Sequence, residues 1–117
     1  MEFLQKKLKK TDITEKLTVP SEWLGDILPY PPRNHDEVRF EVSLISLNDK
    51  STIKSYPLVL STRSLGYLKP VLQSRGWLAF VRETGLEIGD TIHIRKDGNG
   101  QIQVGIEYDF ARRMTTY

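Results

Sequence analysis

The chain has 117 residues, which is the size of a single domain. It contains no cysteine, which excludes disulfides, thiolate nucleophiles, zinc fingers and iron–sulfur clusters and suits a reducing compartment such as the cytosol or nucleus. No apolar run approaches the ~20 residues of a transmembrane helix. The lysine-rich N-terminus has no apolar stretch behind it, so we expect neither a membrane span nor a secretory signal.

Charge is spread unevenly along the sequence, although the whole chain carries only +2. Four consecutive segments alternate in sign, with net charges of +2, −4, +6 and −2 over residues 1–16, 17–49, 50–82 and 83–117. The third segment holds six basic residues and no acid. If the fold brings the two basic segments to one side, the protein has a positive face suited to a polyanion. The alternative is solvated charge that is unevenly spread by chance.

Frequent proline and glycine divide the chain into short runs, which favours β-structure with little helix. The first part predicts, in order, a strand, a polar loop, a short strand and one or two helical turns, over Met1–Leu8, Lys9–Lys16, Leu17–Val19 and Glu22–Leu28. Ser21 is a suitable N-cap for those turns, and Pro29 ends them.

The middle of the chain reads as a β-hairpin. Glu37–Leu47 alternates apolar and polar residues, which is typical of a half-buried strand. Asn48–Lys50 is a predicted turn, and Ser51–Leu60 is the return strand, with Ile53, Leu58 and Leu60 at its apolar positions. Pro57 inside this strand indicates an edge or a bulge.

The last part begins with the polar, basic stretch Ser61–Lys69. Residues 70–83 predict a helix whose buried face carries Trp77, Phe80 and Val81, with Gly85 as its C-cap. Two further strands, separated by a turn at residues 97–100, are expected over Thr91–Lys96 and Gln101–Tyr108. About seven strands and two short helices make a mainly β small barrel the economical fold, with residues 1–110 as the domain and 111–117 as a C-terminal tail.

Catalytic signals are missing from the sequence. The two histidines are His35, in a loop beside two acids, and His93, on the solvent-facing side of a strand. One short segment around His35 supplies too few ligands for a metal site. There is no glycine-rich phosphate loop, and residues 97–100 lack the spacing of a calcium loop. We therefore expect no enzyme activity, cofactor, metal or small-molecule substrate.

Two blocks of sequence carry a family resemblance. The first runs from Phe3 to Ile13 and continues as Leu17-Thr18-Val19-Pro20, and the second is Gly76-Trp77-Leu78-Ala79-Phe80-Val81 followed by Leu86-Glu87-Ile88-Gly89-Asp90. Together, and in this order, they resemble the plant B3 DNA-binding domain over nearly the whole chain. The resemblance implies a seven-stranded open pseudobarrel with two short helices. It also implies a sequence-specific, double-stranded DNA-binding domain of a nuclear plant transcription factor.

DNA lies against two arms in this family, and these correspond here to Lys9–Leu17 and Ser61–Lys69. Both arms fall within the basic segments. The resemblance and side-chain chemistry together give the candidate DNA-binding residues Lys9, Lys10, Thr11, Asp12, Lys16, Thr62, Arg63, Ser64, Tyr67 and Lys69.

These residue types suggest distinct roles. The four lysines suit phosphates as point charges. The guanidinium of Arg63 fits guanine O6 and N7 in the major groove. The hydroxyl groups of the arms suit phosphates or bases, and Tyr67 suits a sugar or a thymine methyl. A phosphate would repel Asp12, which either braces the first arm or accepts from cytosine N4.

A second hypothesis stays open. The second arm lacks the Trp-Asn-Ser-Ser type of sequence found in two branches of the family, and the segments 17–49 and 83–117 are acidic. The chain would then be a B3-like module that has lost specific DNA binding and contacts a protein partner or a second copy of itself. Steep salt dependence of DNA affinity would separate the two hypotheses.

Overall fold

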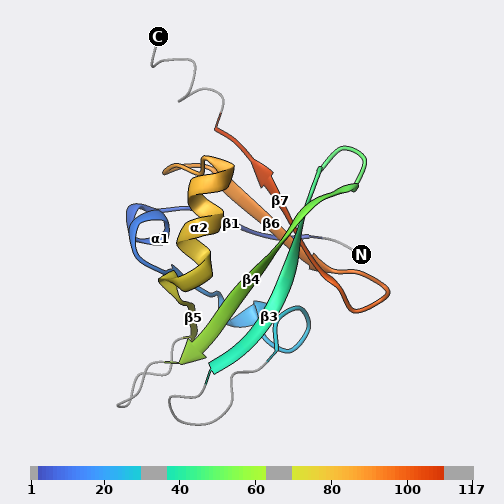
Figure 1. Cartoon of the computed structure of the whole chain (residues 1–117), viewed down its shortest axis with the longest axis horizontal. Helices are drawn as coiled ribbons and strands as arrows, with labels where there is room; N and C mark the ends of the chain where they lie inside the picture. Colours follow the sequence, from blue (N-terminus) through green and yellow to red (C-terminus); the bar gives the residue numbers. More distant parts are fainter. Residues whose placement is uncertain (1–2, 30–36, 63–69, 110–117) are drawn as a thin grey trace.

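A computed structural model describes residues 3–29, 37–62 and 70–109. Within these residues, seven strands form one curled sheet in the order β1-β6-β7-β3-β4-β5-β2 (Figure 1). In chain order their bounds are Leu4–Lys7 (β1), Leu17–Thr18 (β2), Glu37–Ile45 (β3), Thr52–Thr62 (β4), Pro70–Leu72 (β5), Thr91–Lys96 (β6) and Ile102–Glu107 (β7). The predicted seven-stranded open pseudobarrel is confirmed. The expected tail, residues 111–117, lies outside the described residues.

The sheet is built around the long hairpin of β3 and β4, which pair in antiparallel register from Glu37↔Ser61 to Ile45↔Thr52. Its turn is the predicted one, with Lys50 in the left-handed region at φ 63°. The other strand pairs are antiparallel too, except that β3 pairs with β7 in parallel. This parallel pair joins the hairpin to the β6–β7 ribbon, so that all seven strands belong to one sheet.

The helices differ from the prediction in the first half of the chain. Residues Lys9–Lys16 were expected to be a loop, but Lys10–Thr14 form the short helix α1. The polar, β-branched sequence conceals this helix, and lysine is not a usual N-cap residue. The closing contact comes instead from Asp12, whose Oδ2 accepts a hydrogen bond from the Lys9 backbone N–H at 2.8 Å.

The helix expected over residues 22–28 is limited to one 3-10 turn, η1 (Ser21–Trp23). The chain leaves the helix at Gly25, which has φ 86° and whose N–H donates to the Leu28 carbonyl. The second predicted helix is present as α2 (Ser74–Thr84) and ends at Gly85 in the left-handed conformation, as predicted. Its beginning differs, because Pro70–Leu72 form β5 before the helix starts.

The core lies between the curled sheet and α2. Trp77, Phe80 and Val81 are buried, which confirms the predicted apolar face of the helix. The rings of Trp77 and Phe80 stack with centroids 5.4 Å apart, and Tyr56 of β4 meets Phe80 edge-on. Trp23 of η1 is also fully buried, so η1 contributes its indole ring to the same core.

Strand β4 has two features that the sequence pattern only partly predicted. Ile53 is 63% exposed, so the prediction that it belongs to the apolar face of this strand is wrong. It lies next to the hairpin turn, beyond the part of the sheet that α2 covers. Pro57 pairs with Glu41 of β3, whereas β5 pairs with β4 only from Leu60 to Thr62. Pro57 therefore lies on a stretch of β4 with one strand neighbour, which is the edge position that proline in a strand indicates.

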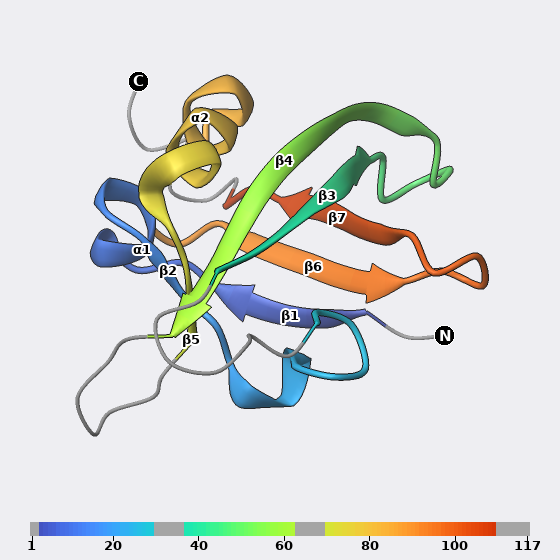
Figure 2. The ribbon, with the colours of Figure 1, turned by 60° about the horizontal axis from the view of Figure 1, so that its bottom comes forward.

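Among the described residues, every helix is too short or too polar to traverse a lipid bilayer. Helices α1 and α2 lie at the same end of the curled sheet, next to the ends of β4 and β5 (Figure 2). This end of the molecule therefore combines the first predicted arm with the base of the second.

Candidate functional site

The first predicted arm is held in shape by Asp12. Asp12 is only 4% exposed, although it belongs to a lysine-rich segment. One carboxylate oxygen accepts from the Lys9 backbone N–H, and the other accepts from Lys6 Nζ at 3.2 Å. Through these contacts Asp12 braces the arm, and its carboxylate is buried rather than available to a ligand.

A second contact attaches α1 to the core. The indole Nε1 of Trp77 donates a hydrogen bond to the Asp12 backbone carbonyl at 2.6 Å, and this contact is buried. The inner side of α1 is thus fixed by α2. Lys9, Lys10 and Thr11 are exposed on its outer side, where they are accessible to a partner.

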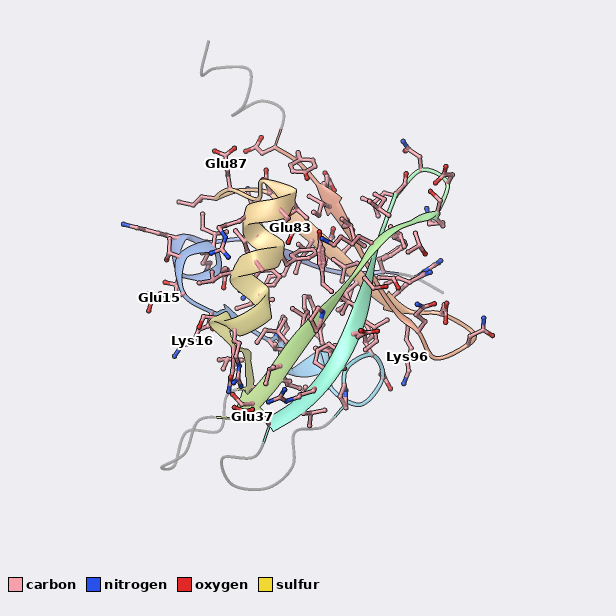
Figure 3. All side chains as sticks on the ribbon, viewed as in Figure 1. Glu15, Lys16, Glu37, Glu83, Glu87 and Lys96 are labelled. Carbon is pink, nitrogen blue, oxygen red and sulfur yellow. The ribbon has the colours of Figure 1, made fainter. Side chains whose placement is uncertain are left out.

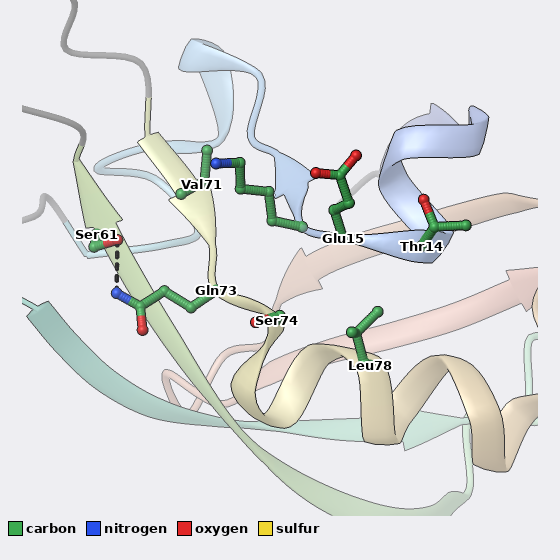
Figure 4. Close-up of a pocket in the computed structure, with 8 residues that line it drawn as sticks. Thr14, Glu15, Ser61, Val71, Gln73, Ser74 and Leu78 are labelled. Carbon is green, nitrogen blue, oxygen red and sulfur yellow. Dashed lines mark hydrogen bonds between the residues drawn. The ribbon is translucent and has the colours of Figure 1, made fainter.

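A groove with a volume of about 540 Å³ separates α1 from the sheet and α2. Residues of the first arm form one wall, and residues from β4, β5 and α2 form the other (Figure 4). The lining residues are Thr14, Glu15, Lys16, Ser61, Val71, Gln73, Ser74 and Leu78. We call this the arm groove, because its lining includes Lys16 of the first predicted arm and Ser61, the first residue of the second.

A second groove, of about 440 Å³, lies on the other side of α1. Its lining includes Lys6, Lys9, Thr11 and Asp12, together with Thr18 and Pro20. Helix α1 and its flanks therefore line two polar grooves.

The lysines on and beside α1 differ from other basic residues in having no carboxylate partner among the described residues. Within the described part of the chain, Lys9, Lys10 and Lys16 make no ion pair, whereas three other basic side chains do. Lys6 pairs with Asp12, Lys54 with Glu83, and Arg75 with Glu37. Two basic residues of the 50–82 segment are thus already neutralised. Among the described residues, Lys9, Lys10 and Lys16 are thus basic side chains without an ion pair at this end of the molecule, and Lys16 lies on the same side as Glu15 (Figure 3).

The pair of Lys54 and Glu83 is the clearest electrostatic coupling among the described groups. Lys54 Nζ lies 2.6 Å from Glu83 Oε1, and the Tyr56 hydroxyl donates to the same oxygen. These two hydrogen bonds lower the pKa of Glu83, and the same carboxylate raises the pKa of Lys54. Burial raises the pKa of Tyr56, and its hydrogen bond to Glu83 acts in the same direction. The cluster joins β4 to α2 and does not line the arm groove.

Half of the predicted binding residues can be located. Lys9, Lys10, Thr11, Asp12 and Lys16 lie on or beside α1. Thr62 is the last residue of β4, and its side chain is not described. Arg63, Ser64, Tyr67 and Lys69 lie outside the described residues, so their roles stay predictions.

The arm groove also contains residues that were not among the predicted binding residues, although two of them lie within the predicted arms. Glu15, Ser61 and Gln73 line it. Gln73 Nε2 donates to Ser61 Oγ and to Glu37 Oε1, both at 3.0 Å. Arg75 Nη2 donates to Gln73 Oε1 and to both oxygens of Glu37. This network ties the start of β3 to the end of β4 and the start of α2, and no spacing in the sequence reveals it.

The histidines show no catalytic arrangement in the described residues. His93 is half-buried on β6 and lies 2.9 Å from Glu107 Oε1. His35 lies outside the described residues. No group of three or more acidic or histidine side chains in the described chain is arranged to hold a metal ion.

Comparison by sequence finds no match, either to a family model or to a curated protein. Comparison by structure does. The Arabidopsis FUS3-DNA complex is similar with a TM-score of 0.69 and 18% identity, over 91% of this chain and 97% of that one. A hypothetical Arabidopsis thaliana protein is similar with a TM-score of 0.58 and 20% identity, over 90% of this chain and 88% of that one.

The chain has the B3 domain fold. The shared region spans nearly all of both compared chains, so the B3 fold accounts for the whole curled sheet and not for a local motif. In this B3 fold the arm groove lies at the end of the sheet where α1, β5 and α2 meet.

Proposed function

We propose that this B3 domain binds double-stranded DNA through α1 and the arm groove. The observation that carries the proposal is that the first predicted arm and the first residue of the second arm line the same groove. Lys16 of the first arm and Ser61 of the second line one groove, with Lys9 and Lys10 exposed on the adjacent helix. A protein of the same fold was solved as a complex with DNA. Fold similarity alone does not identify a ligand. The choice of DNA is therefore argued from the charge and geometry of this end of the chain.

The electrostatics fit a duplex. Lys9, Lys10 and Lys16 have no competing carboxylate within ion-pair distance among the described residues, so they are available to phosphates. Phosphate contacts give affinity and fix the register of the protein on the duplex, but they carry no sequence information. Base reading in the major groove then belongs to the second arm, where Arg63 is the residue suited to guanine. The resulting function is that of a sequence-specific transcription factor domain in a plant nucleus, without catalysis.

Selection from random duplexes tests this proposal. Purified protein is used to enrich a short element, and the best duplex and a scrambled duplex are then titrated at two salt concentrations. We expect one element to be enriched, its affinity to fall steeply with salt, and Arg63→Ala to abolish the preference. Weak, salt-sensitive binding without enrichment would reject sequence-specific reading. No binding at low salt would reject DNA as the ligand and favour a module that contacts proteins.

A further inference from the structure

The arm groove contains a carboxylate whose position is unexpected for a surface that binds a polyanion. Glu15 lies on the α1 side of the groove, next to Lys16 and opposite Gln73 and Ser61 (Figure 4). Its side chain is exposed and makes no hydrogen bond or ion pair with the described residues. Facing a phosphate, this carboxylate would weaken binding by repulsion. Facing a suitable donor, it would gain a charge-assisted hydrogen bond.

The other carboxylates at this end are already occupied. Asp12 is buried and accepts from Lys9 and Lys6. Glu37 accepts from Arg75 and Gln73. Of these three acidic groups, Glu15 alone presents free acceptor oxygens to a ligand in the arm groove. The acceptor role that the sequence left open for Asp12 is therefore better suited to Glu15.

The base edges of the major groove differ in what they offer a carboxylate. Cytosine presents only a donor, its N4 amino group, whereas guanine presents the acceptors N7 and O6. Thymine presents the acceptor O4 and a methyl group, and adenine presents the acceptor N7 beside its N6 donor. A carboxylate is thus favoured by cytosine, opposed by guanine and thymine, and only partly satisfied by adenine.

We propose that Glu15 reads a cytosine by accepting a hydrogen bond from its N4 amino group in the arm groove. This inference rests on the proposed function, because it requires a duplex at this face. Lys16 lies next to Glu15 in sequence and lines the same groove, so a phosphate contact there would hold the duplex beside the carboxylate. Gln73 and Ser61 are tied into their network, which keeps the facing wall of the groove in place.

The test compares base preferences for the wild-type chain, Glu15→Ala and Glu41→Ala by selection from random duplexes. Glu41 is an exposed carboxylate on β3 that does not line the arm groove, so its variant removes the same charge elsewhere. We expect wild type and Glu41→Ala to share a cytosine preference of roughly fivefold or more at one position. Glu15→Ala should lose that preference and keep the others. Glu15→Gln should move it toward adenine, which a glutamine amide pairs bidentately.

The outcomes separate this inference from the proposed function. If Glu15→Ala tightens binding to every duplex and leaves the selected element unchanged, Glu15 only repels phosphate and the inference is overturned. Wild-type binding without any base preference also overturns it, while DNA binding itself stands. Failure of the wild-type chain to bind any duplex at low salt overturns both.

Discussion

The indole Nε1 of Trp77 donates a hydrogen bond to the backbone carbonyl of Asp12 at 2.6 Å, across 65 positions of sequence. This contact joins a buried residue in the first part of α2 to the helix that carries the exposed Lys10. The side chain of the same Asp12 accepts from Lys9 and Lys6. Asp12 thus couples the packing of the core to the position of α1. A substitution that removes the Trp77 donor should therefore also displace α1 at the candidate interface.

Replacing Trp77 with Phe tests the link. The variant loses the indole donor and leaves the buried Asp12 carbonyl without it, which together with lost volume should cost roughly 2–4 kcal/mol of unfolding free energy. Trp23→Phe is the matched control, because the equally buried indole Nε1 of Trp23 has no hydrogen-bond partner in the described residues. Trp23→Phe should lower the unfolding free energy by less, because the substitution removes a donor that has no acceptor in the described part of the chain. Chemical denaturation measures both.

Amide hydrogen exchange adds a local readout. In Trp77→Phe the amides of Glu15 and Lys16, which both donate to the Thr11 carbonyl, should exchange faster relative to those of β6. In Trp23→Phe they should keep their wild-type ratio. Equal acceleration of α1 and β6 in Trp77→Phe would mean that the indole contact stabilises the whole fold without holding α1 in particular.

Gly76 is required where α2 crosses β4. It has φ 82°, and a methyl group there would lie 2.5 Å from the backbone carbonyl oxygen of Pro57. We expect Gly76→Ala to lower the unfolding free energy by roughly 2 kcal/mol or more, from backbone strain and the displaced helix. Gly98→Ala is the control, because a methyl group at Gly98 meets nothing within 4 Å. It should change stability by about 0.5 kcal/mol or less. Similar urea midpoints for the two variants would contradict this account.

Much of the sheet was predictable because local patterns and tertiary packing agree there. Local sequence was sufficient to predict the alternation in β3, the turn at Asn48–Lys50 and the apolar face of α2. Trp77, Phe80 and Val81 identified that helix face, and Gly85 identified the end of the helix. The arrangement that brings α1 beside α2 follows from long-range contacts, such as Trp77 to Asp12, which no local period encodes.

The candidate site was predictable only in part for the same reason. The lysine-rich composition identified the first arm, but its helix depends on the carboxylate of Asp12 turning back to the Lys9 N–H. Glu15 and Gln73 became candidates only when the fold placed them on opposite walls of one groove. Glutamate and glutamine at solvent-exposed positions are common, so neither residue is distinctive in the sequence itself.

The hydrogen bonds to Glu83 predict a defined pH dependence. Because donation from Lys54 and Tyr56 lowers the pKa of Glu83 in the folded state, the pair stabilises the fold above the ordinary glutamate pKa of about 4.3. That contribution is lost as the pH falls through the lower, folded-state value. Glu83→Gln should therefore lower Tm relative to wild type at pH 7, and the difference should shrink as the pH falls below about 4.3. For the control Glu41→Gln, a pH-dependent difference of similar size would contradict the assignment.

The lysines on and beside α1 predict how the salt dependence of DNA binding divides among residues. If Lys10 and Lys16 each neutralise a phosphate, Lys10→Ala and Lys16→Ala should each reduce the slope of log affinity against log salt by about 1. Lys96 lies on the opposite side of the molecule from Lys16 (Figure 3), so Lys96→Ala removes the same charge away from the proposed interface. Its slope should match that of wild type. Fluorescence anisotropy on one duplex at four salt concentrations measures all three variants. Equal slopes for Lys16→Ala and Lys96→Ala would place the duplex elsewhere on the protein, because a charge acting only through the overall field has no preferred side.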